Sequence, residues 1–226
     1  LRGSAKSPQL LADLTASGLR WQELSIARVT LRSDVVSAAQ IGGSLNVQVS
    51  ELKQGELLVR LLSLEARGNE QRHQLQLNID GEPGSGQLAL NGSVDRQTER
   101  WRGTLNNTHF NTPVGEWRLT RDISLDYRNT QQSISISPHC WRNPNAELCV
   151  PRTIEAGPSG QASIVLNRFD LVMLDQLLDS DTKVSGVFTG NADVSWRADG
   201  TLPQARVTLN GNGVSVTQMI EGQPLP

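Results

Sequence analysis

The 226-residue sequence has few of the side chains that usually fill a protein core. Hydrophobic residues make up 37% of the chain and aromatic residues only 4%, with five Trp, three Phe and one Tyr. Two sheets that pack face to face lie about 10 Å apart, and large side chains are needed to fill the space between them. We therefore expect sheets with apolar faces that the chain itself fills poorly.

The sequence also lacks an excess of basic charge and a long apolar run. Its 21 basic and 23 acidic residues give a net charge of −2, and only Lys6, Lys53 and Lys183 are lysines. The arginines are scattered singly, which excludes the basic footprint of a general nucleic-acid-binding protein. No run approaches the roughly 18 apolar residues of a membrane span, and no signal peptide opens the chain.

Known catalytic and cofactor motifs are absent as well. His73, His109 and His139 lie far apart in the sequence, and there is no GxSxG, HExxH, Walker loop or GxGxxG after a strand. The segment DSD at 179–181 does not fit the EF-hand calcium loop. We expect neither an enzyme nor a bound cofactor or metal.

Period-two alternation is what the sequence has in abundance. In QLQLNIDGEPGSGQLALNGSV, residues 74–94, Leu75, Leu77 and Ile79 alternate with polar residues. After a Gly/Pro turn, Leu88 and Leu90 alternate with polar or small residues in the same way. This pattern predicts two paired strands, each with one apolar and one polar face.

The same alternation recurs along most of the chain. Residues 8–17 are typical either of a short helix, with Ser7 as N-cap, or of a strand. Residues 55–69 are rich in leucine, but we favour two paired strands that meet around Gly68 and Asn69. Residues 170–181 predict one helix, with Asp170 as N-cap and leucines at helical spacing. Further strands are expected at 24–32, 43–50, 100–107, 115–128, 133–137, 160–169, 184–196 and 204–216.

Cys140 and Cys149 are the only cysteines, and they enclose a ten-residue loop that contains the turn sequence Asn-Pro-Asn. A disulfide here would stabilise the fold by about 2.5–3 kcal/mol and would imply an oxidising compartment, which for a bacterial chain is the periplasm. The alternatives are two free thiols, or a metal site with His139. The metal site lacks the CxxC spacing of structural zinc sites and has no evident fourth ligand.

These features together predict an all-β fold. The strands recur with no break in composition, so we expect one continuous β-rich segment over 1–226. Glycines lie inside strands, in NGSV, WRGTL, VSGVFTG and TLNGNG, where they usually mark bends or close approach. We expect a long curled antiparallel meander with an apolar concave face, and one short helix near 170–179.

Three features in this order resemble the TamB family: the cysteine loop HCWRNPNAELCV, the helix after LNRFDL, and the block KVSGVFTGNADVSWRADGTLPQARVTLNGNG. TamB proteins are inner-membrane-anchored periplasmic subunits of the bacterial translocation and assembly module. They belong to the AsmA-like group, which is similar to the bridge-like lipid transfer proteins. The resemblance covers essentially the whole chain and suggests an internal piece towards the C-terminal half of a longer protein.

The resemblance implies a U-shaped, taco-like sheet in the periplasm of a Gram-negative bacterium. It also implies an outer-membrane Omp85-family partner, TamA, engaged through the full-length protein. The implied roles are outer-membrane protein assembly and the movement of phospholipid between the inner and outer membranes.

Alternation and resemblance together predict an apolar groove that holds phospholipid acyl chains. An alternative is a chaperone-like scaffold that binds client β-strands of outer-membrane proteins or autotransporters at a sheet edge. In a closed sandwich the same apolar residues would pack on each other. A carbohydrate-binding jelly roll would need exposed aromatic platforms, which the chain lacks. The residues predicted to line the groove are Leu75, Leu77, Ile79, Leu88, Leu90, Val94, Ile134, Ile136, Ile164, Leu166, Phe188 and Val194.

Overall fold

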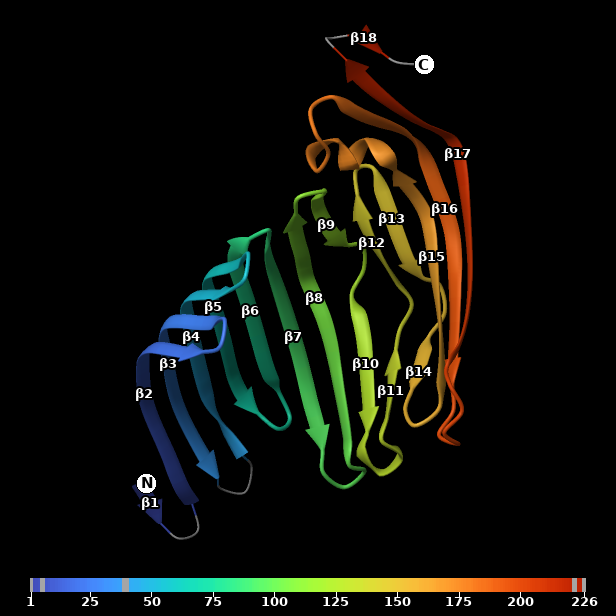
Figure 1. Cartoon of the computed structure of the whole chain (residues 1–226). Helices are drawn as coiled ribbons and strands as arrows, with labels where there is room; N and C mark the ends of the chain where they lie inside the picture. The colour runs from blue at the N-terminus through green and yellow to red at the C-terminus, as the bar shows by residue number, and fades with distance from the viewer. Residues whose placement is uncertain (1, 5–6, 38–40, 221–222, 225–226) are drawn as a thin grey trace. The chain divides into compact units, whose positions relative to one another are not determined.

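The computed structural model describes residues 2–4, 7–37, 41–220 and 223–224, with side chains at 8–37 and 41–218 (Figure 1). The chain divides into two compact units, Leu1–Phe110 and Asn111–Pro226. Both units consist of antiparallel strands, and the described residues contain only two short 3-10 helices. The predicted all-β class is confirmed.

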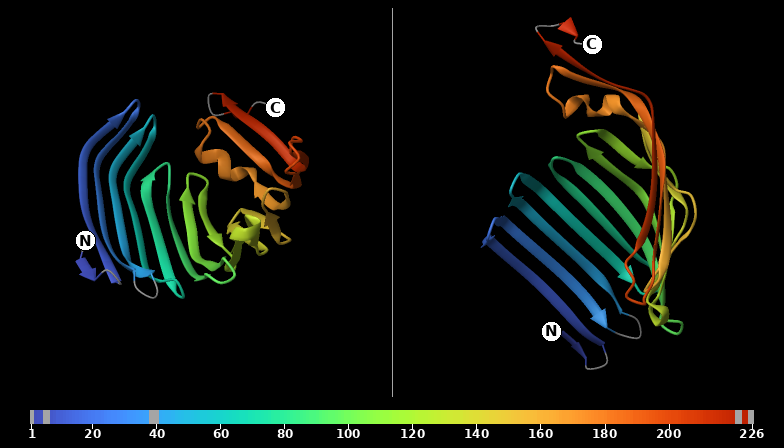
Figure 2. Two further views of the ribbon diagram at one scale, coloured as in Figure 1. Left: turned by 90° about the horizontal axis from the view of Figure 1, so that it is seen from below. Right: turned by 45° about the vertical axis from the view of Figure 1, so that its right-hand side comes forward.

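The first unit is a meander in which each strand pairs with the next. The strands β1 to β7 form antiparallel ladders in chain order, and β8 lies next to β7. Both views in Figure 2 show these strands side by side in a single layer. The strands are β1 (Arg2–Ser4), β2 (Ser7–Trp21), β3 (Leu24–Ser37), β4 (Ile41–Gln54), β5 (Leu57–Asn69), β6 (His73–Glu82), β7 (Ser85–Asp95) and β8 (Arg100–Thr112), the last of which ends in the second unit.

Two ambiguous segments of the sequence are strands. Residues 8–17 lie within β2, which pairs with β3 from Gln9 to Trp21, so the helical alternative is wrong. A long ladder outweighs a weak local helix preference. The leucine-rich segment 55–69 forms β5, and the chain turns between Asn69 and Arg72 before β6 begins. This confirms the predicted pairing of the two strands.

The second unit departs from a simple meander in its first half. The hairpins β10–β11 and β12–β13 lie end to end, because β13 and β14 both pair along β15, while β11 pairs with β14 and β9 with β12. Pro138 and Pro151 lie at the breaks between these short strands, where a residue without an N–H cannot continue a ladder. The elements are β9 (Gly115–Leu119), β10 (Ile123–Arg128), η1 (Asn129–Gln131), β11 (Ser133–Ile136), β12 (His139–Asn143), β13 (Ala146–Val150), β14 (Ile154–Ala156), β15 (Gly160–Asp170), η2 (Leu171–Gln176), β16 (Thr182–Trp196), β17 (Gln204–Ile220) and β18 (Gln223–Pro224).

The predicted helix near 170–179 is present as the 3-10 helix η2. The Asp170 carboxylate accepts a hydrogen bond from the Val172 N–H at 3.2 Å, so the predicted N-cap is confirmed. Leu171 and Met173 are the buried residues of η2. At its end, the Asp175 carboxylate accepts from Lys183 Nζ at 3.4 Å, which ties η2 to β16.

Neither unit has a sealed core of ordinary size. Among the described residues, only five hydrophobic ones are buried, and all of them belong to the second unit: Ile123, Ala146, Cys149, Leu171 and Met173. The chain exposes 15,088 Å² to solvent, whereas a compact monomer of this length exposes roughly 10,000 Å². The apolar faces are therefore not closed into a sandwich within either unit.

Four of the nine Trp, Phe and Tyr rings cover strand glycines. The Trp101 indole lies over Gly92 and Gly103, where an added Cβ would come within 2.9 and 2.3 Å of it. An aromatic ring on a neighbouring strand replaces the packing that a glycine cannot provide. At Gly92, Gly103 and Gly211 the close approach expected at strand glycines is therefore an approach of rings, whereas at Gly186 and Gly190 it is an approach of the β17 backbone. The other ring–glycine pairs are Phe110–Gly86, Trp196–Gly160 and Phe188–Gly211.

Candidate functional site

The first unit carries straight rows of apolar side chains across its strands. Directly paired residues lie on the same face of a sheet, so the ladder registers define each row. The central row crosses six strands, from β2 to β7, and spans about 24 Å at about 4.8 Å per strand. Its members are Leu14, Leu31, Val47, Leu64, Leu77 and Leu88.

Two parallel rows flank the central row on the same face. One row contains Leu45, Ala66, Leu75 and Leu90, and the other contains Val29, Val49, Leu62 and Ile79. These side chains are half-buried by their neighbours within the sheet. The result is a continuous aliphatic surface, which we call the apolar face of the first unit.

The second unit has a similar row. It crosses β9, β12, β13, β15, β16 and β17, and a glycine interrupts it at β16. The register places Leu119, Trp141, Leu148, Leu166, Gly190 and Leu209 in this row. Leu148 is 36% exposed and Leu209 58% exposed, so the row is open to solvent at several points.

The structure places the predicted groove residues on apolar rows of the two units. In the first unit, Leu75 pairs with Leu90 and Leu77 with Leu88, while Ile79 lies opposite Gly86. Val94 lies at the end of β7, where it is 37% exposed. In the second unit, the register positions are Ile134 opposite Ala156, Ile136 opposite Ile154, Ile164 opposite Ala192, Leu166 opposite Gly190, Phe188 opposite Gly211 and Val194 opposite Ala162.

The prediction missed the half of the first apolar face that lies on β2 to β5. Leu14, Leu31, Val47 and Leu64 belong to the central row together with Leu77 and Leu88. The same period-two alternation marks these residues in the sequence, so the signal was available. What the alternation could not supply was the register that aligns one strand with the next.

A hollow of about 280 Å³ opens in the apolar face of the first unit, and its lining includes Val35, Leu45 and Val94. His73 closes one side. Its Nε2 accepts a hydrogen bond from Trp101 Nε1 at 2.9 Å, and its Nδ1 lies 3.2 Å from the Asn69 carbonyl. Because an indole N–H can only donate, Nε2 is the acceptor of this bond, and the two contacts together fix the orientation of the ring.

The cysteine pair lies on the other face of the second unit. Cys140 and Cys149 face each other across β12 and β13 and form a disulfide with an S–S distance of 2.04 Å, which confirms the predicted bond. Both sulfurs are consumed by the bond, so the alternative metal site with His139 is wrong. The pKa of Glu147 beside the disulfide is lowered, first by the hydrogen bond from Arg142 and then by that from Asn167.

Charged residues gather on the opposite, polar face of each sheet. On the first unit, Arg60 lies at a register shift in β5, where it bonds the Asp80 carboxylate at 3.0 and 3.1 Å and Glu82 at 2.8 Å. The Arg60 hydrogen bond lowers the pKa of Asp80, and the same contact raises the pKa of Arg60. The ion pairs thus hold the irregular part of the ladder without entering the apolar face.

Comparison with known proteins identifies the group to which this architecture belongs. The family model described as "TamB, N-terminal domain" matches residues 1–226. The chain belongs to the TamB family. A relative from Haemophilus influenzae, "Translocation and assembly module subunit TamB", is 31% identical over 222 residues, which are 98% of this chain and 17% of the relative. No solved structure gives a significant match.

The TamB match corrects one expectation from the sequence. The matching model is an N-terminal domain, which contradicts the expected placement towards the C-terminal half of a longer protein. Successive strand repeats resemble one another, so alternation carries no information about position along such a chain. Within the described residues of this TamB segment, no helix has the length and apolarity needed to cross a membrane.

Proposed function

We propose that this chain is a segment of a periplasm-spanning, inner-membrane-anchored protein of the translocation and assembly module. In this proposal its apolar faces shield phospholipid acyl chains that move between the inner and outer membranes, and the full-length protein supports outer-membrane protein assembly. The observation that carries the proposal is the set of long aliphatic rows that no second sheet covers within either unit.

The size of a row suits an acyl chain. The central row of the first unit crosses about 24 Å of sheet, and one leaflet of a bilayer contributes about 15 Å of hydrocarbon thickness. An acyl chain that lies along the row would therefore be covered over its whole length on one side. Each buried CH₂ contributes about 0.8 kcal/mol, or about 10 kcal/mol for one chain before its ordering is counted.

The residues proposed to line the path are the predicted set, extended by the row members on β2 to β5. They are aliphatic, which gives affinity for hydrocarbon without directional contacts to any one lipid. This lack of directional contacts allows a lipid to slide from one strand to the next, because no hydrogen bond must break at each step. TamA is the proposed outer-membrane partner, engaged through the full-length protein.

The test is lipid co-purification with a charged substitution on the apolar face. Leu90→Asp places a carboxylate beside Leu75, whereas Ser93→Asp adds the same charge to the polar face of the same strand. Organic extracts of the purified chain and of both variants are analysed by mass spectrometry, with circular dichroism to confirm folding. We expect stoichiometric phospholipid with the parent and with Ser93→Asp, and little with Leu90→Asp. A lipid-free parent that also takes up no added fluorescent phospholipid would refute the proposal.

A second candidate function is the binding of client β-strands, and the free edge of β17 favours it. Among the described strands, β17 pairs with β16 from Gln204 to Gln218, and with β18 only at Met219 and Ile220. An exposed ladder edge can accept a strand of another protein through backbone hydrogen bonds. Such binding would survive Leu90→Asp, since it does not use the apolar side chains of β7.

A further inference from the structure

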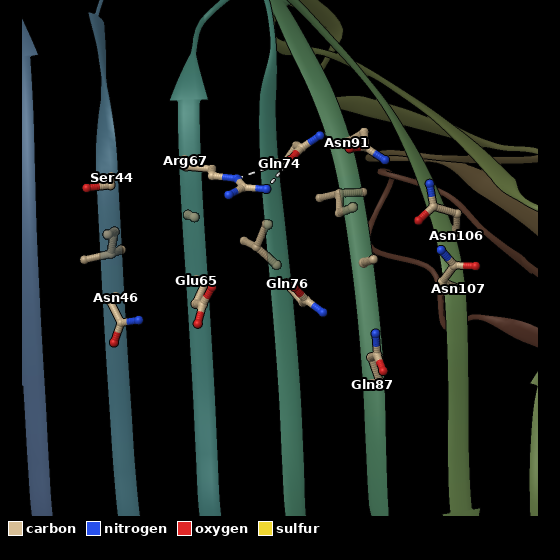
Figure 3. A pocket seen from close by; sticks show the side chains of 15 residues that line it. Ser44, Asn46, Glu65, Arg67, Gln74, Gln76, Gln87, Asn91, Asn106 and Asn107 are labelled. Atoms are coloured by element: carbon tan, nitrogen blue, oxygen red, sulfur yellow. Dashed lines mark hydrogen bonds between the residues drawn. The ribbon is translucent and has the colours of Figure 1, made fainter.

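A hollow of about 680 Å³ lies on the polar face of the first unit, and its side-chain amides play no part in the lipid proposal. It lies across β4 to β8, and Figure 3 shows the fifteen residues that line it. Seven of these residues carry carboxamide groups: Asn46, Gln74, Gln76, Gln87, Asn91, Asn106 and Asn107. We propose that this hollow binds an oligosaccharide of N-acetylated amino sugars.

A small side chain creates the hollow. Ala89 pairs directly with Gln76 on β6, and its neighbours on the same face of β7 are Gln87 and Asn91, which Figure 3 labels. Its methyl group is therefore the floor of a depression whose walls are longer amides. Seven of the fifteen lining residues carry carboxamides, and Glu65 and Arg67 are the charged ones; Leu45, Ala66, Leu75 and Leu90 of the neighbouring apolar row also contribute to the lining.

A backbone irregularity adds amides to the wall on β8. Asn107 has a left-handed backbone with φ of 43°, a conformation in which asparagine is enriched. Asn106 and Asn107 both line the hollow although they are neighbours in one strand (Figure 3). A local irregularity of this kind can bring two successive side chains to one face.

The side-chain amides around Ala89 make few hydrogen bonds within the protein. Gln74 accepts long hydrogen bonds from Arg67 at 3.3 and 3.4 Å. The other six carboxamides make no side-chain hydrogen bond within the described part of the chain. Each therefore offers two donors and one acceptor oxygen to a ligand. Such a surface matches sugar hydroxyls, which also both donate and accept.

The composition of the hollow excludes other ligand classes. Its charged residues, Glu65 and Arg67, have opposite signs, so it favours neither anions nor cations. An extended peptide would need a strand edge, whereas β4, β5 and β6 are paired on both sides. The lining holds no aromatic ring, so stacking on a platform plays no part. The methyl floor surrounded by amides is complementary to an acetamido group, which has a methyl end and an amide end.

Nuclear magnetic resonance titration of the whole chain tests the inference. The probe is N,N′-diacetylchitobiose, and cellobiose serves as the comparison because it has the same linkage with hydroxyl in place of acetamido. We expect the side-chain NH₂ resonances of Gln76, Gln87, Asn91 and Asn106 to shift with diacetylchitobiose and to respond much less to cellobiose. Equal responses to the two sugars, or no shifts with either, would overturn the proposal.

Two variants test the location of the site. Ala89→Gln fills the floor and should weaken binding at least about tenfold, while Thr30→Gln makes a similar change on the same face outside the hollow and should leave binding unchanged. If Ala89→Gln disturbs the fold, Asn91→Ala is the second variant, because it removes one of the amide side chains that form the wall. Undiminished binding in folded Ala89→Gln or Asn91→Ala would refute the site. Leu75 and Leu90 also line the hollow, but Ala89 and Asn91 point to the face opposite Leu90, so these variants and Leu90→Asp test the two proposals separately.

Discussion

Replacement of Leu77 by alanine tests directly whether the apolar face of the first unit is covered. Leu77 lies in the central row, where its directly paired neighbours are Leu64 and Leu88. Each cross-strand contact of this kind contributes about 0.2–1 kcal/mol. We therefore expect Leu77→Ala to lower the free energy of unfolding of the first unit by about 0.5–2 kcal/mol.

A leucine sealed between two sheets would behave differently. Leu→Ala in a closed core costs about 2–5 kcal/mol, since a cavity is left behind. Met173, a residue of η2 that is only 6% exposed, provides the internal comparison for a sealed site. Met173→Ala should lower the free energy of unfolding of the second unit by about 2–5 kcal/mol, well above the loss from Leu77→Ala.

Hydrogen exchange in graded urea, followed by mass spectrometry, separates the two units because peptides from β6 and from η2 report on each unit individually. A loss above about 3 kcal/mol for Leu77→Ala in lipid-free protein would show that the face is sealed, and would refute the reasoning. In the presence of phospholipid at 100 times its Kd, the parent should gain about 2.7 kcal/mol. Leu77→Asp, in contrast, should gain little.

Three further predictions concern local structure. Reduction of the Cys140–Cys149 disulfide should lower the free energy of unfolding of the second unit by about 2–3 kcal/mol, because it frees a ten-residue loop. Urea unfolding with and without reductant measures this loss. A Cys149→Ala variant should show the same loss without reductant. Gly68→Ala should destabilise the turn between β5 and β6, since the added Cβ would lie 2.2 Å from the Arg72 carbonyl oxygen at a backbone φ of 126°. Gly55→Ala has open space at a φ of 58° and should cost only about 1 kcal/mol. Equal melting temperatures for the two variants would contradict this prediction. The pKa of Asp170 lies below its ordinary 3.8, first because of the hydrogen bond from the Val172 N–H and then because of Arg168. Its carboxylate therefore stabilises the fold above about pH 4, and this stabilisation is lost as the pH falls through the lowered native pKa. Asp170→Asn should lose less stability than the parent between neutral pH and pH 3, as followed by circular dichroism.

Period-two alternation predicted most of the strands, because successive side chains of a strand point to opposite faces of the sheet and only one of these faces is apolar. It succeeded at 74–94, where the turn sequence and two alternating runs specify a hairpin. At Asp170 a different local signal succeeded, namely an N-cap residue followed by leucines at helical spacing. Alternation left residues 8–17 open, since Leu10 and Leu14, four residues apart, share one face both in a helix and in a strand. Only the partner β3 decides between them, and a partner is not a local property of the sequence.

The interrupted ladders of the second unit show a different limit. Pro138 and Pro151 are visible in the sequence as strand breakers, and each does end a strand. The sequence could not reveal that β13 and β14 would share β15 as their partner, because that arrangement depends on two hairpins that lie end to end. The alternation around Cys140 and Cys149 likewise predicts paired strands but not the register that places the sulfurs opposite each other.

Strand parity links the two surfaces of the first unit. Leu75, Leu77, Leu88 and Leu90 form the apolar face only because Gln74, Gln76, Gln87 and Ala89 point the other way, so each strand contributes to both faces at once. In a closed sandwich a second sheet would cover the apolar face, and only the polar face would contact water. Here the apolar face retains solvent contact, and the polar face carries an amide-lined hollow. A single layer of strands can therefore present hydrocarbon to one ligand and hydrogen bonds to another, and substitutions at adjacent positions can address the two separately.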